Sequence, residues 1–266
     1  MAGNVTTLTL QKKKANGEKI TSLTAYDFST ARTLDEAGID FILVGDSLGM
    51  VVLGYENTIP VTLEDMIHHT RAVARGAHRA MVVADMPFLS YHVSIEEAVR
   101  NAGRLIQEGG AHAVKIEGGR PVVDTVKRMV DAGIPVLCHL GMTPQSVYKF
   151  GGFRVQGRQE TDAERILSDA HDLQSAGAFG VVLELIPADL AKVVTESLDI
   201  PTIGIGAGRH CDGQVLISDD MLGIYTDLQP KHNKKYADLH VTMRTAFEEY
   251  IKEVKEGSFP GLEHSF

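Results

Sequence analysis

The stretch FILVGDS, residues 41–47, decides the fold, because an apolar run there ends in an acidic residue. Three other runs end in the same way: MVVADMP at Asp85, AVKIEGG at Glu117 and VVLELIP at Glu184. Each run is typical of a strand buried on both faces, where a carboxylate is costly unless a cation or a proton offsets its charge. Four such acids at the same point of a repeated unit predict one acidic centre where parallel strands converge.

Amphipathic segments alternate with the apolar runs. We expect strands within residues 22–27, 39–46, 80–87, 111–118, 134–141, 179–187, 200–208 and 214–218, and helices within 29–37, 63–75, 94–108, 122–132, 162–176 and 237–257. Strands that are apolar throughout and separated by helices predict a parallel sheet. Eight such units in 266 residues favour a (β/α)8 TIM barrel over an open doubly wound sheet. Residues 1–266 contain no evident linker, so we expect one domain with a C-terminal helix and a polar tail.

The composition excludes several classes of protein. A net charge of −9 argues against nucleic acid as the main partner. Cys138 and Cys211 match no zinc-site spacing, and such sparse cysteine usage predicts a reducing cytoplasm without disulfides. The N-terminus lacks the apolar core of a signal peptide, and no apolar stretch approaches the roughly 20 residues that cross a membrane. We therefore expect a cytoplasmic protein that acts on small molecules.

Three of the acidic strand ends are consecutive in the expected barrel. Asp46, Asp85 and Glu117 end the second, third and fourth strands, and adjacent strands lie about 4.8 Å apart. Their carboxylates can therefore surround one ion directly or through its waters. Ligands that are all oxygen indicate Mg²⁺ or another hard divalent cation. In the alternative interpretation, one or two of these acids cap the following helix or pair with a base.

Glu184 and Lys115 are the other charged candidates. Glu184 ends the sixth strand, across the barrel mouth from the other acids, in an apolar setting that suits a general base. A salt bridge to a lysine or arginine is the alternative. Lys115 lies two residues before Glu117, so both side chains point to one face of the strand. Lys115 can neutralise a substrate carboxylate there, form an internal ion pair, or do both.

His139 and Ser47 are the polar candidates beside these charges. His139 ends the fifth strand and can donate a hydrogen bond to a substrate oxygen, unless it is a satisfied core histidine. Ser47 follows Asp46 at a strand-to-helix junction, where it can hold an anionic oxygen or only cap the helix. Two long loops, residues 51–65 and 142–162, follow the second and fifth strands and are expected to be lids or binding loops.

Longer segments resemble the ketopantoate hydroxymethyltransferase family, also called 3-methyl-2-oxobutanoate hydroxymethyltransferases. The resemblance runs from about Leu8 to the C-terminus. Its segments are TAYDFSTARTLDEAGID (24–40), LVGDSLGMVVLGYENTIPVTLEDM (43–66), ADMPFLSY (84–91), VKIEGG (114–119), PVLCHLGMTPQSV (135–147), GGFRVQGR (151–158), LELIP (183–187), IGIGAGRHCDGQVLI (203–217) and FPGLEHSF (259–266).

The resemblance implies a (β/α)8 barrel of the phosphoenolpyruvate-binding group. It also implies the reaction, the metal and the assembly of the protein. Members of the family transfer a hydroxymethyl group from 5,10-methylenetetrahydrofolate to 3-methyl-2-oxobutanoate. The product, 2-dehydropantoate, forms through a metal-stabilised enolate on the way to pantothenate and coenzyme A. The implied metal is Mg²⁺, with other divalent cations as alternatives, and the implied assembly is a homodecamer of two pentameric rings. The matching positions are Asp46, Asp85 and Glu117 for the metal, Asp46, Ser47, Asp85 and Lys115 for the keto acid, and Glu184 for the general base.

Two other functions stay open. One is a metal-dependent carbon–carbon lyase or phosphonomutase of the same barrel group that acts on a 2-oxo acid. Known lyases of that group often carry a reactive cysteine on a loop, whereas Cys138 lies within the expected fifth strand and Cys211 follows a glycine turn. The other is a non-catalytic barrel that binds a ligand or serves as an assembly subunit, in which Glu184 would be dispensable. Fold alone does not decide among these functions.

Overall fold

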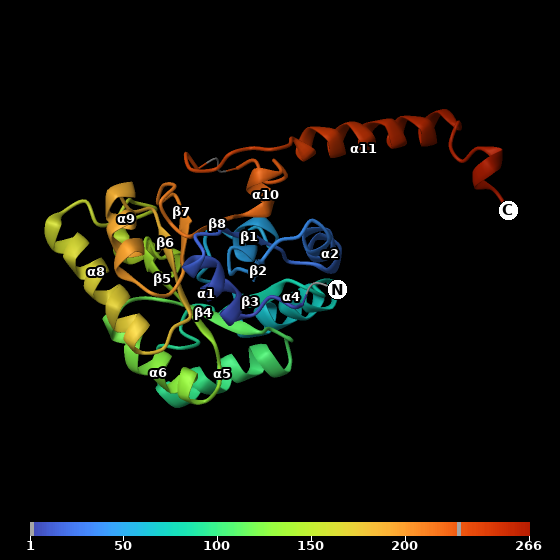
Figure 1. Cartoon of the computed structure of the whole chain (residues 1–266). Helices are drawn as coiled ribbons and strands as arrows, with labels where there is room; N and C mark the ends of the chain where they lie inside the picture. The colour runs from blue at the N-terminus through green and yellow to red at the C-terminus, as the bar shows by residue number, and fades with distance from the viewer. Residues whose placement is uncertain (1–2, 228–229) are drawn as a thin grey trace. The chain divides into compact units, whose positions relative to one another are not determined.

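The computed structural model describes residues 3–227 and 230–266, and its central element is a closed barrel of eight parallel strands (Figure 1). Each strand pairs with the next one along the chain, and β8 pairs with β1 to close the ring. The strands are β1 Ile20–Thr24, β2 Phe41–Val44, β3 Met81–Asp85, β4 Ala113–Glu117, β5 Val136–Gly141, β6 Gly180–Glu184, β7 Thr202–Ile205 and β8 Gly213–Leu216. The predicted (β/α)8 barrel is confirmed.

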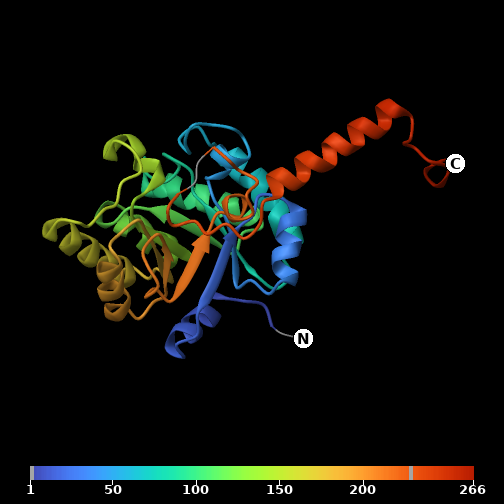
Figure 2. The same ribbon diagram turned by 90° about the horizontal axis from the view of Figure 1, so that it is seen from above.

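Helices connect the successive strands from β1 to β7 around the outside of the barrel (Figures 1 and 2). The longer helices of this part are α1 Thr7–Ala15, α2 Phe28–Glu36, α4 Leu63–Gly76, α5 Ile95–Gln107, α6 Val123–Asp131, α8 Glu160–Ser175 and α9 Ala188–Ser197. The short ones are α3 Leu48–Val51, α7 Val147–Phe150, η1 Arg120–Val122 and η2 Pro144–Ser146. Residues 206–212, all of them described, join β7 to β8 without a helix. Gly213, the first residue of β8, pairs with Ile203, which lies two residues before the end of β7. The chain therefore runs back along only part of the barrel before β8 begins.

The first strand departs from its predicted position. The sequence predicts it at residues 22–27, whereas β1 spans Ile20–Thr24. Asp27 is instead the N-cap of α2, where its carboxylate accepts a hydrogen bond from the Thr30 N–H at 2.9 Å. The strand ends before Asp27 because this side chain satisfies a free backbone donor of the helix.

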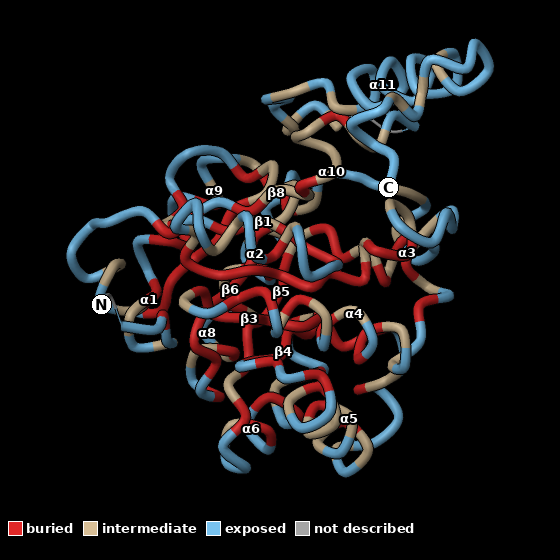
Figure 3. The backbone as a smooth tube through the Cα atoms, turned by 90° about the vertical axis from the view of Figure 1, so that its right-hand side faces the viewer, coloured by how far each residue is buried: buried red, intermediate tan, exposed pale blue. Residues whose placement is uncertain are grey.

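Along β2 to β6, alternate side chains belong to two apolar cores, and Figure 3 shows buried backbone both in the strands and on parts of the surrounding helices. Phe41 and Leu43 belong to the cluster that fills the barrel, while Ile42 and Val44 belong to the cluster beneath the helices. Full burial of one such side chain contributes about 1.5–3 kcal/mol to stability. The barrel interior is therefore a packed core, not a channel, and only its ends can hold a site.

Backbone contacts divide the chain into two compact units, one ending at Ile217 and one running from Ser218 to Phe266. The first unit contains the barrel. The second contains α10 Ser218–Met221, the short η3 Leu262–His264 and α11 Leu239–Glu256, the helix predicted at residues 237–257. The single domain expected over residues 1–266 stays a prediction. Among the described residues, no helix is both long and apolar enough to cross a membrane.

Candidate active site

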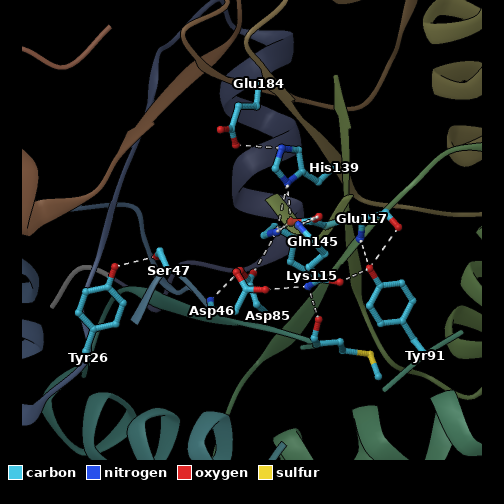
Figure 4. A network of polar contacts seen from close by, with 11 residues as sticks. Tyr26, Asp46, Ser47, Asp85, Tyr91, Lys115, Glu117, His139, Gln145 and Glu184 are labelled. Carbon is cyan, nitrogen blue, oxygen red and sulfur yellow. Dashed lines mark hydrogen bonds and ion pairs between the residues drawn. The ribbon is translucent and has the colours of Figure 1, made fainter. Parts of the chain in front are cut away.

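Polar side chains follow apolar ones at the inward positions of β3 and β4. On β3, the core residue Val83 is followed by Asp85. On β4, Ala113 is followed by Lys115 and Glu117. Because side chains two residues apart share one face of a strand, these groups meet inside the barrel at its C-terminal end (Figure 4). Barrel enzymes place their active sites at this end.

The three acids from consecutive strands come together, as the sequence predicts. Asp46, Asp85 and Glu117 are each only 3–4% exposed. The backbone N–H of Asp46 donates to Asp85 Oδ2 at 3.1 Å, so the ends of β2 and β3 are joined directly at the site. Burial of three carboxylates in one place requires compensating charge.

Lys115 supplies part of that charge. Its Nζ lies 3.3 Å from Asp85 Oδ1 and 3.6 Å from Glu117 Oε1, and its side chain is 4% exposed. The internal ion pair that we expected as one role of Lys115 is therefore present. His139 lies on the adjoining strand, with its Nδ1 3.2 Å from Lys115 Nζ and 3.5 Å from Glu117 Oε1.

The pKa values of the three acids show that Lys115 and His139 offset their negative charge only in part. Burial, together with Asp85 and Glu117, raises the pKa of Asp46 well above its usual value. Burial also raises the pKa of Asp85, although Lys115 acts in the opposite direction. For Glu117, burial is outweighed by Lys115 and His139, which lower its pKa overall. A further cation would therefore stabilise the ionised form of Asp46 and Asp85.

His139 links the acidic centre to Glu184. Its Nε2 lies 3.2 Å from Glu184 Oε2 on β6. Burial and the charge on Lys115 lower the pKa of His139, but its contacts with Glu117 and Glu184 outweigh them and raise it to about 9. The two carboxylates therefore favour the protonated imidazole, and the ammonium group of Lys115 opposes it. His139 is a residue of the site, paired with its charged groups, rather than an isolated core histidine.

Glu184 is more accessible than the other acids. Its side chain is 14% exposed, against 4% for Glu117. Its partner is His139, whereas the alternative interpretation expected a lysine or arginine. The next residue, Leu185, has a φ of 46°, a left-handed conformation that costs about 1–2 kcal/mol for a residue with a Cβ. The Leu185 N–H donates to the Ile205 carbonyl at 3.0 Å, which fixes this turn against β7.

Ser47 lies at the start of α3, but its side chain makes no capping hydrogen bond. Its Oγ lies 2.8 Å from the Tyr26 hydroxyl instead. Gly45 provides the space for this arrangement, since a Cβ there would lie 2.7 Å from Ser47 Oγ and 3.6 Å from Asp85 Oδ2. The hydroxyl of Ser47 is therefore close to the acidic centre and does not cap the helix, while its contact with the substrate stays a prediction.

Two further residues belong to the site although no sequence pattern singles them out. Gln145, in η2, donates through Nε2 to Asp46 Oδ2 at 2.8 Å. Tyr91, in the loop after β3, donates from its hydroxyl to Gln145 Oε1 at 2.7 Å. Both lie in segments that carry the family resemblance, ADMPFLSY and PVLCHLGMTPQSV, which is the signal that could have identified them.

The residues of the centre fit a hard divalent cation. In the described chain, Asp85 Oδ1 and Glu117 Oε1 are buried without a hydrogen-bond partner. Oxygen ligands of this kind suit Mg²⁺, which binds through one or two protein carboxylates and keeps several waters. Across the described residues, no group of three His, Cys, Asp or Glu side chains is placed so that it could hold a metal ion. The centre is therefore not a closed structural metal site, and the fit to a cation rests on the two unpartnered carboxylate oxygens of Asp85 and Glu117.

The cysteines do not favour the lyase alternative. Both are free and buried. Cys138 lies within β5, where burial raises the pKa of its thiol. Burial also raises the pKa of Cys211, in the connection between β7 and β8. Neither is an exposed loop thiol poised to donate a proton to a substrate.

The fold and the site together define a class, the (β/α)8 barrels with an acidic, lysine-containing centre at the C-terminal mouth. Phosphonopyruvate hydrolase in complex with oxalate and Mg²⁺ has a similar structure, with a TM-score of 0.62, 10% identity and coverage of 97% of this chain and 92% of that chain. For 2,3-dimethylmalate lyase, a PEP mutase/isocitrate lyase superfamily member, the values are 0.60, 17%, 98% and 90%. At these identities the likeness shows the fold alone.

Sequence relatives identify the family within this class. The profile of the ketopantoate hydroxymethyltransferase family matches residues 4–262. The 3-methyl-2-oxobutanoate hydroxymethyltransferase of Syntrophus aciditrophicus (strain SB) is 62% identical over 98% of this chain and 96% of the relative. That of Thermoanaerobacter sp. (strain X514) is 60% identical over 100% of this chain and 97% of the relative. The chain belongs to the ketopantoate hydroxymethyltransferase family, which confirms the resemblance seen in its sequence.

Proposed function

We propose that this protein transfers a hydroxymethyl group from 5,10-methylenetetrahydrofolate to 3-methyl-2-oxobutanoate and forms 2-dehydropantoate, a step toward pantothenate. Membership of the family supports this reaction. The observation that carries the proposal is the line of contacts from Asp85 through Lys115 and His139 to Glu184. This line joins a centre that can bind a metal and an anion to a carboxylate that can act as a base.

The keto acid binds through its carboxylate and its 2-oxo group. Lys115 supplies positive charge for the carboxylate, and Ser47 supplies a hydroxyl beside the same centre. His139 lies between Lys115 and Glu184, so it is the candidate donor to a substrate oxygen only if the keto acid takes the place of its Nε2 contact with Glu184. Binding in a buried site strengthens each of these interactions relative to water.

Asp46, Asp85 and Glu117 are the residues that would hold Mg²⁺ or another divalent cation. Bound there, the ion would supply Lewis-acid polarisation of the 2-oxo group, which acidifies the neighbouring C3 hydrogen. The protein contributes the three buried acids. Hydrogen bonds from Gln145 Nε2 and from the Asp46 N–H hold one carboxylate oxygen of Asp46 and one of Asp85 in place.

Glu184 removes the C3 proton of the keto acid. His139 contacts Oε2 of Glu184, which orients the carboxylate and leaves Oε1 to accept the proton. The resulting enolate carbon forms the new carbon–carbon bond to the one-carbon unit, and both carbon–nitrogen bonds to the folate break. The proton held by Glu184 and one proton of water go to the two folate nitrogens. Water supplies the oxygen of the hydroxymethyl group, so keto acid, methylenetetrahydrofolate and water give 2-dehydropantoate and tetrahydrofolate.

The loop after β5 is the candidate folate site. Tyr148 and Phe153 are 75% and 45% exposed and present aromatic faces. The same loop carries three exposed cations, Lys149, Arg154 and Arg158. A folate combines planar aromatic rings with an anionic glutamate tail, so both of its parts have matching side chains here.

Two contacts tie this loop to neighbouring parts of the barrel mouth. Tyr148 accepts a hydrogen bond on its hydroxyl from Asn57 Nδ2, in the loop after β2, at 3.0 Å. The Gln156 N–H donates to the Leu185 carbonyl at 2.9 Å, one residue beyond Glu184. A folate held by this loop would therefore lie near the proposed base.

Product formation tests the function directly. Purified protein is incubated with methylenetetrahydrofolate and 3-methyl-2-oxobutanoate, and 2-dehydropantoate is measured by mass spectrometry. We expect turnover with Mg²⁺, loss of turnover after removal of divalent ions by a chelator, and recovery when Mg²⁺ is added back. A protein that binds Mg²⁺ and keto acid yet forms no product would contradict the proposal.

A matched pair of charge variants tests the folate loop. The triple variant Lys149→Ala/Arg154→Ala/Arg158→Ala is expected to raise KM for the folate by about 3-fold to about 100-fold, as three exposed charges allow. Folate-free exchange of the C3 proton should be unchanged. Arg120→Ala/Lys127→Ala/Arg128→Ala removes the same charge from η1 and α6 and should leave KM at the native value. An equal rise in both variants would rule out a specific folate contact by the loop.

A further inference from the structure

Gln145 makes four hydrogen bonds within the acidic centre although it comes from a loop (Figure 4). Its Nε2 donates to Asp46 Oδ2 at 2.8 Å and to the Met86 carbonyl at 2.9 Å. Its backbone N–H donates to Glu117 Oε2 at 3.0 Å, and its Oε1 accepts from the Tyr91 hydroxyl at 2.7 Å. Since Nε2 meets two acceptors and Oε1 meets a donor, one orientation of the amide satisfies every partner.

One oxygen of each acid is held by an N–H group. Gln145 holds Asp46 Oδ2 with its side chain and Glu117 Oε2 with its backbone. The Asp46 N–H holds Asp85 Oδ2. The opposite oxygens of Asp85 and Glu117 face Lys115, at 3.3 Å and 3.6 Å. Gln145 thus holds one oxygen of Asp46 and one of Glu117, and in Glu117 the other oxygen faces Lys115.

Tyr91 supports Gln145 from the loop after β3. The side chain of Tyr91 is buried, and its hydroxyl both donates to Gln145 Oε1 and accepts from the Glu117 N–H at 3.1 Å. The hydroxyl therefore fixes the amide and the end of β4 at the same time. A buried amide oxygen that loses its donor carries a desolvation cost, so the position of Gln145 depends on Tyr91.

We propose that Gln145 is a positioning residue for the metal and the keto acid, with Tyr91 as its support; this inference rests on the proposed function. A neutral amide suits the role because it donates to two acids without adding charge. A cation at this place would compete with the metal, and a carboxylate would repel Asp46 and Glu117. Without the amide, Asp46 is free to rotate, and its oxygens are no longer preorganised for an ion.

The variant Gln145→Met tests this role, because it keeps the length of the side chain and removes the amide. Mg²⁺ binding is measured by calorimetry with 3-methyl-2-oxobutanoate present, and the unfolding temperature is measured without metal. We expect the Mg²⁺ affinity to fall about 10–100-fold. The Mg²⁺ concentration needed for C3 exchange should rise by the same factor, while the exchange rate at saturating Mg²⁺ stays closer to the native rate.

The variant Gln174→Met is the matched control. Gln174 Oε1 accepts hydrogen bonds from the N–H groups of Asp199 at 2.7 Å and Ile200 at 3.2 Å, away from the acidic centre. Its loss should lower the unfolding temperature and leave Mg²⁺ affinity unchanged. If both variants lose Mg²⁺ affinity in step with their stability, Gln145 is only structural and the proposal is wrong.

The variant Tyr91→Phe gives an independent check. It should weaken Mg²⁺ binding less than Gln145→Met, and the double variant should bind as weakly as Gln145→Met alone, because both changes remove one connected contact. Native Mg²⁺ affinity in Gln145→Met, or fully additive losses, would overturn the proposal. If the native protein binds Mg²⁺ but forms no product, the proposed function is wrong. The calorimetric measurement of Mg²⁺ affinity would still decide the role of Gln145.

Discussion

Lys115 carries the positive charge on which the buried acids most directly depend. Its ammonium group lies 3.3 Å from Asp85 Oδ1 and 3.6 Å from Glu117 Oε1. We expect Lys115→Met to lower the free energy of unfolding of the metal-free protein by about 3–5 kcal/mol, because the acids lose a buried partner. Mg²⁺ should raise the unfolding temperature of this variant more than that of the native protein, since the ion replaces the missing charge. Thermal unfolding with and without Mg²⁺ measures both effects.

Lys13 provides the control for this prediction. It pairs with Asp40 at 2.6 Å, and its side chain is 25% exposed. Lys13→Met should cost less stability, because water replaces part of the lost interaction. Its response to Mg²⁺ should equal that of the native protein. Equal Mg²⁺ responses in native protein and Lys115→Met would mean that Lys115 does not offset charge at the metal centre.

The strand residues of the site could be predicted from sequence, but its loop residues could not. Lys115 and Glu117 were predictable because a strand repeats every two residues, which fixes the face to which each side chain points. Asp85 was predictable because it ends an apolar run. Gln145 lies in the single turn of η2 and Tyr91 in a loop, where no period fixes the direction of a side chain, and a neutral side chain becomes informative only when its partners are known.

At the scale of elements, the ends of β5 and β6 fit closely at Gly141. Gly141 pairs with Glu184 and has a φ of 95°. A Cβ at Gly141 would overlap the Glu184 carbonyl oxygen and lie 2.7 Å from Ile186 Cγ2. We expect Gly141→Ala to displace the end of β6 and to slow C3 exchange by about 10²-fold, because misplacement of the base by about 1 Å has this effect. The exchange rate at saturating keto acid is the measurement.

The variant Gly133→Ala is the control that distinguishes the effect of backbone strain from the effect of the contact at Gly141. The φ of Gly133 is 85°, yet a Cβ there would have no atom within 4 Å. Gly133→Ala should therefore cost about 1–2 kcal/mol of stability through its backbone alone and leave the exchange rate near the native rate. Equal exchange rates in the two variants would show that the contact at Gly141 does not position Glu184.

Element boundaries show where sequence patterns reach their limit. Apolar runs located all eight strands, because a strand buried on both faces leaves a distinct signal. The end of β1 was misplaced, since Asp27 caps α2 and the capping role of an aspartate depends on local geometry. The helix-free connection at residues 206–212 agrees with the sequence, which leaves only residues 209–213 between the last two expected strands.

At the scale of the whole molecule, α11 presents apolar side chains that its own unit does not cover. No residue of α11 is buried. Phe247 is 59% exposed, Tyr250 56% and Ile251 48%. Exposed apolar groups gathered on one helix indicate contact with another surface. The homodecamer implied by the family resemblance stays a prediction, and sedimentation velocity should give a particle of ten chains. A monomer at micromolar concentration would contradict it.

The barrel and the assembly differ in how far sequence can predict them. The barrel follows from a repeated unit, and each repeat adds evidence for the same architecture. The assembly depends on surfaces whose partners lie outside the chain, so only the family resemblance suggested its size. The cytoplasmic location likewise stays a prediction based on composition.

Exchange of the C3 proton of 3-methyl-2-oxobutanoate tests the central claim, that Glu184 is the base of a metal-dependent enolisation. The exchange is followed by proton NMR in D2O without folate. With Mg²⁺, the native protein is expected to remove the C3 signal, and a chelator should stop the loss. Glu184→Gln should slow exchange by about 10²–10⁴-fold, the usual contribution of a general base, while Mg²⁺ still binds. Exchange at the native rate in Glu184→Gln would contradict the account.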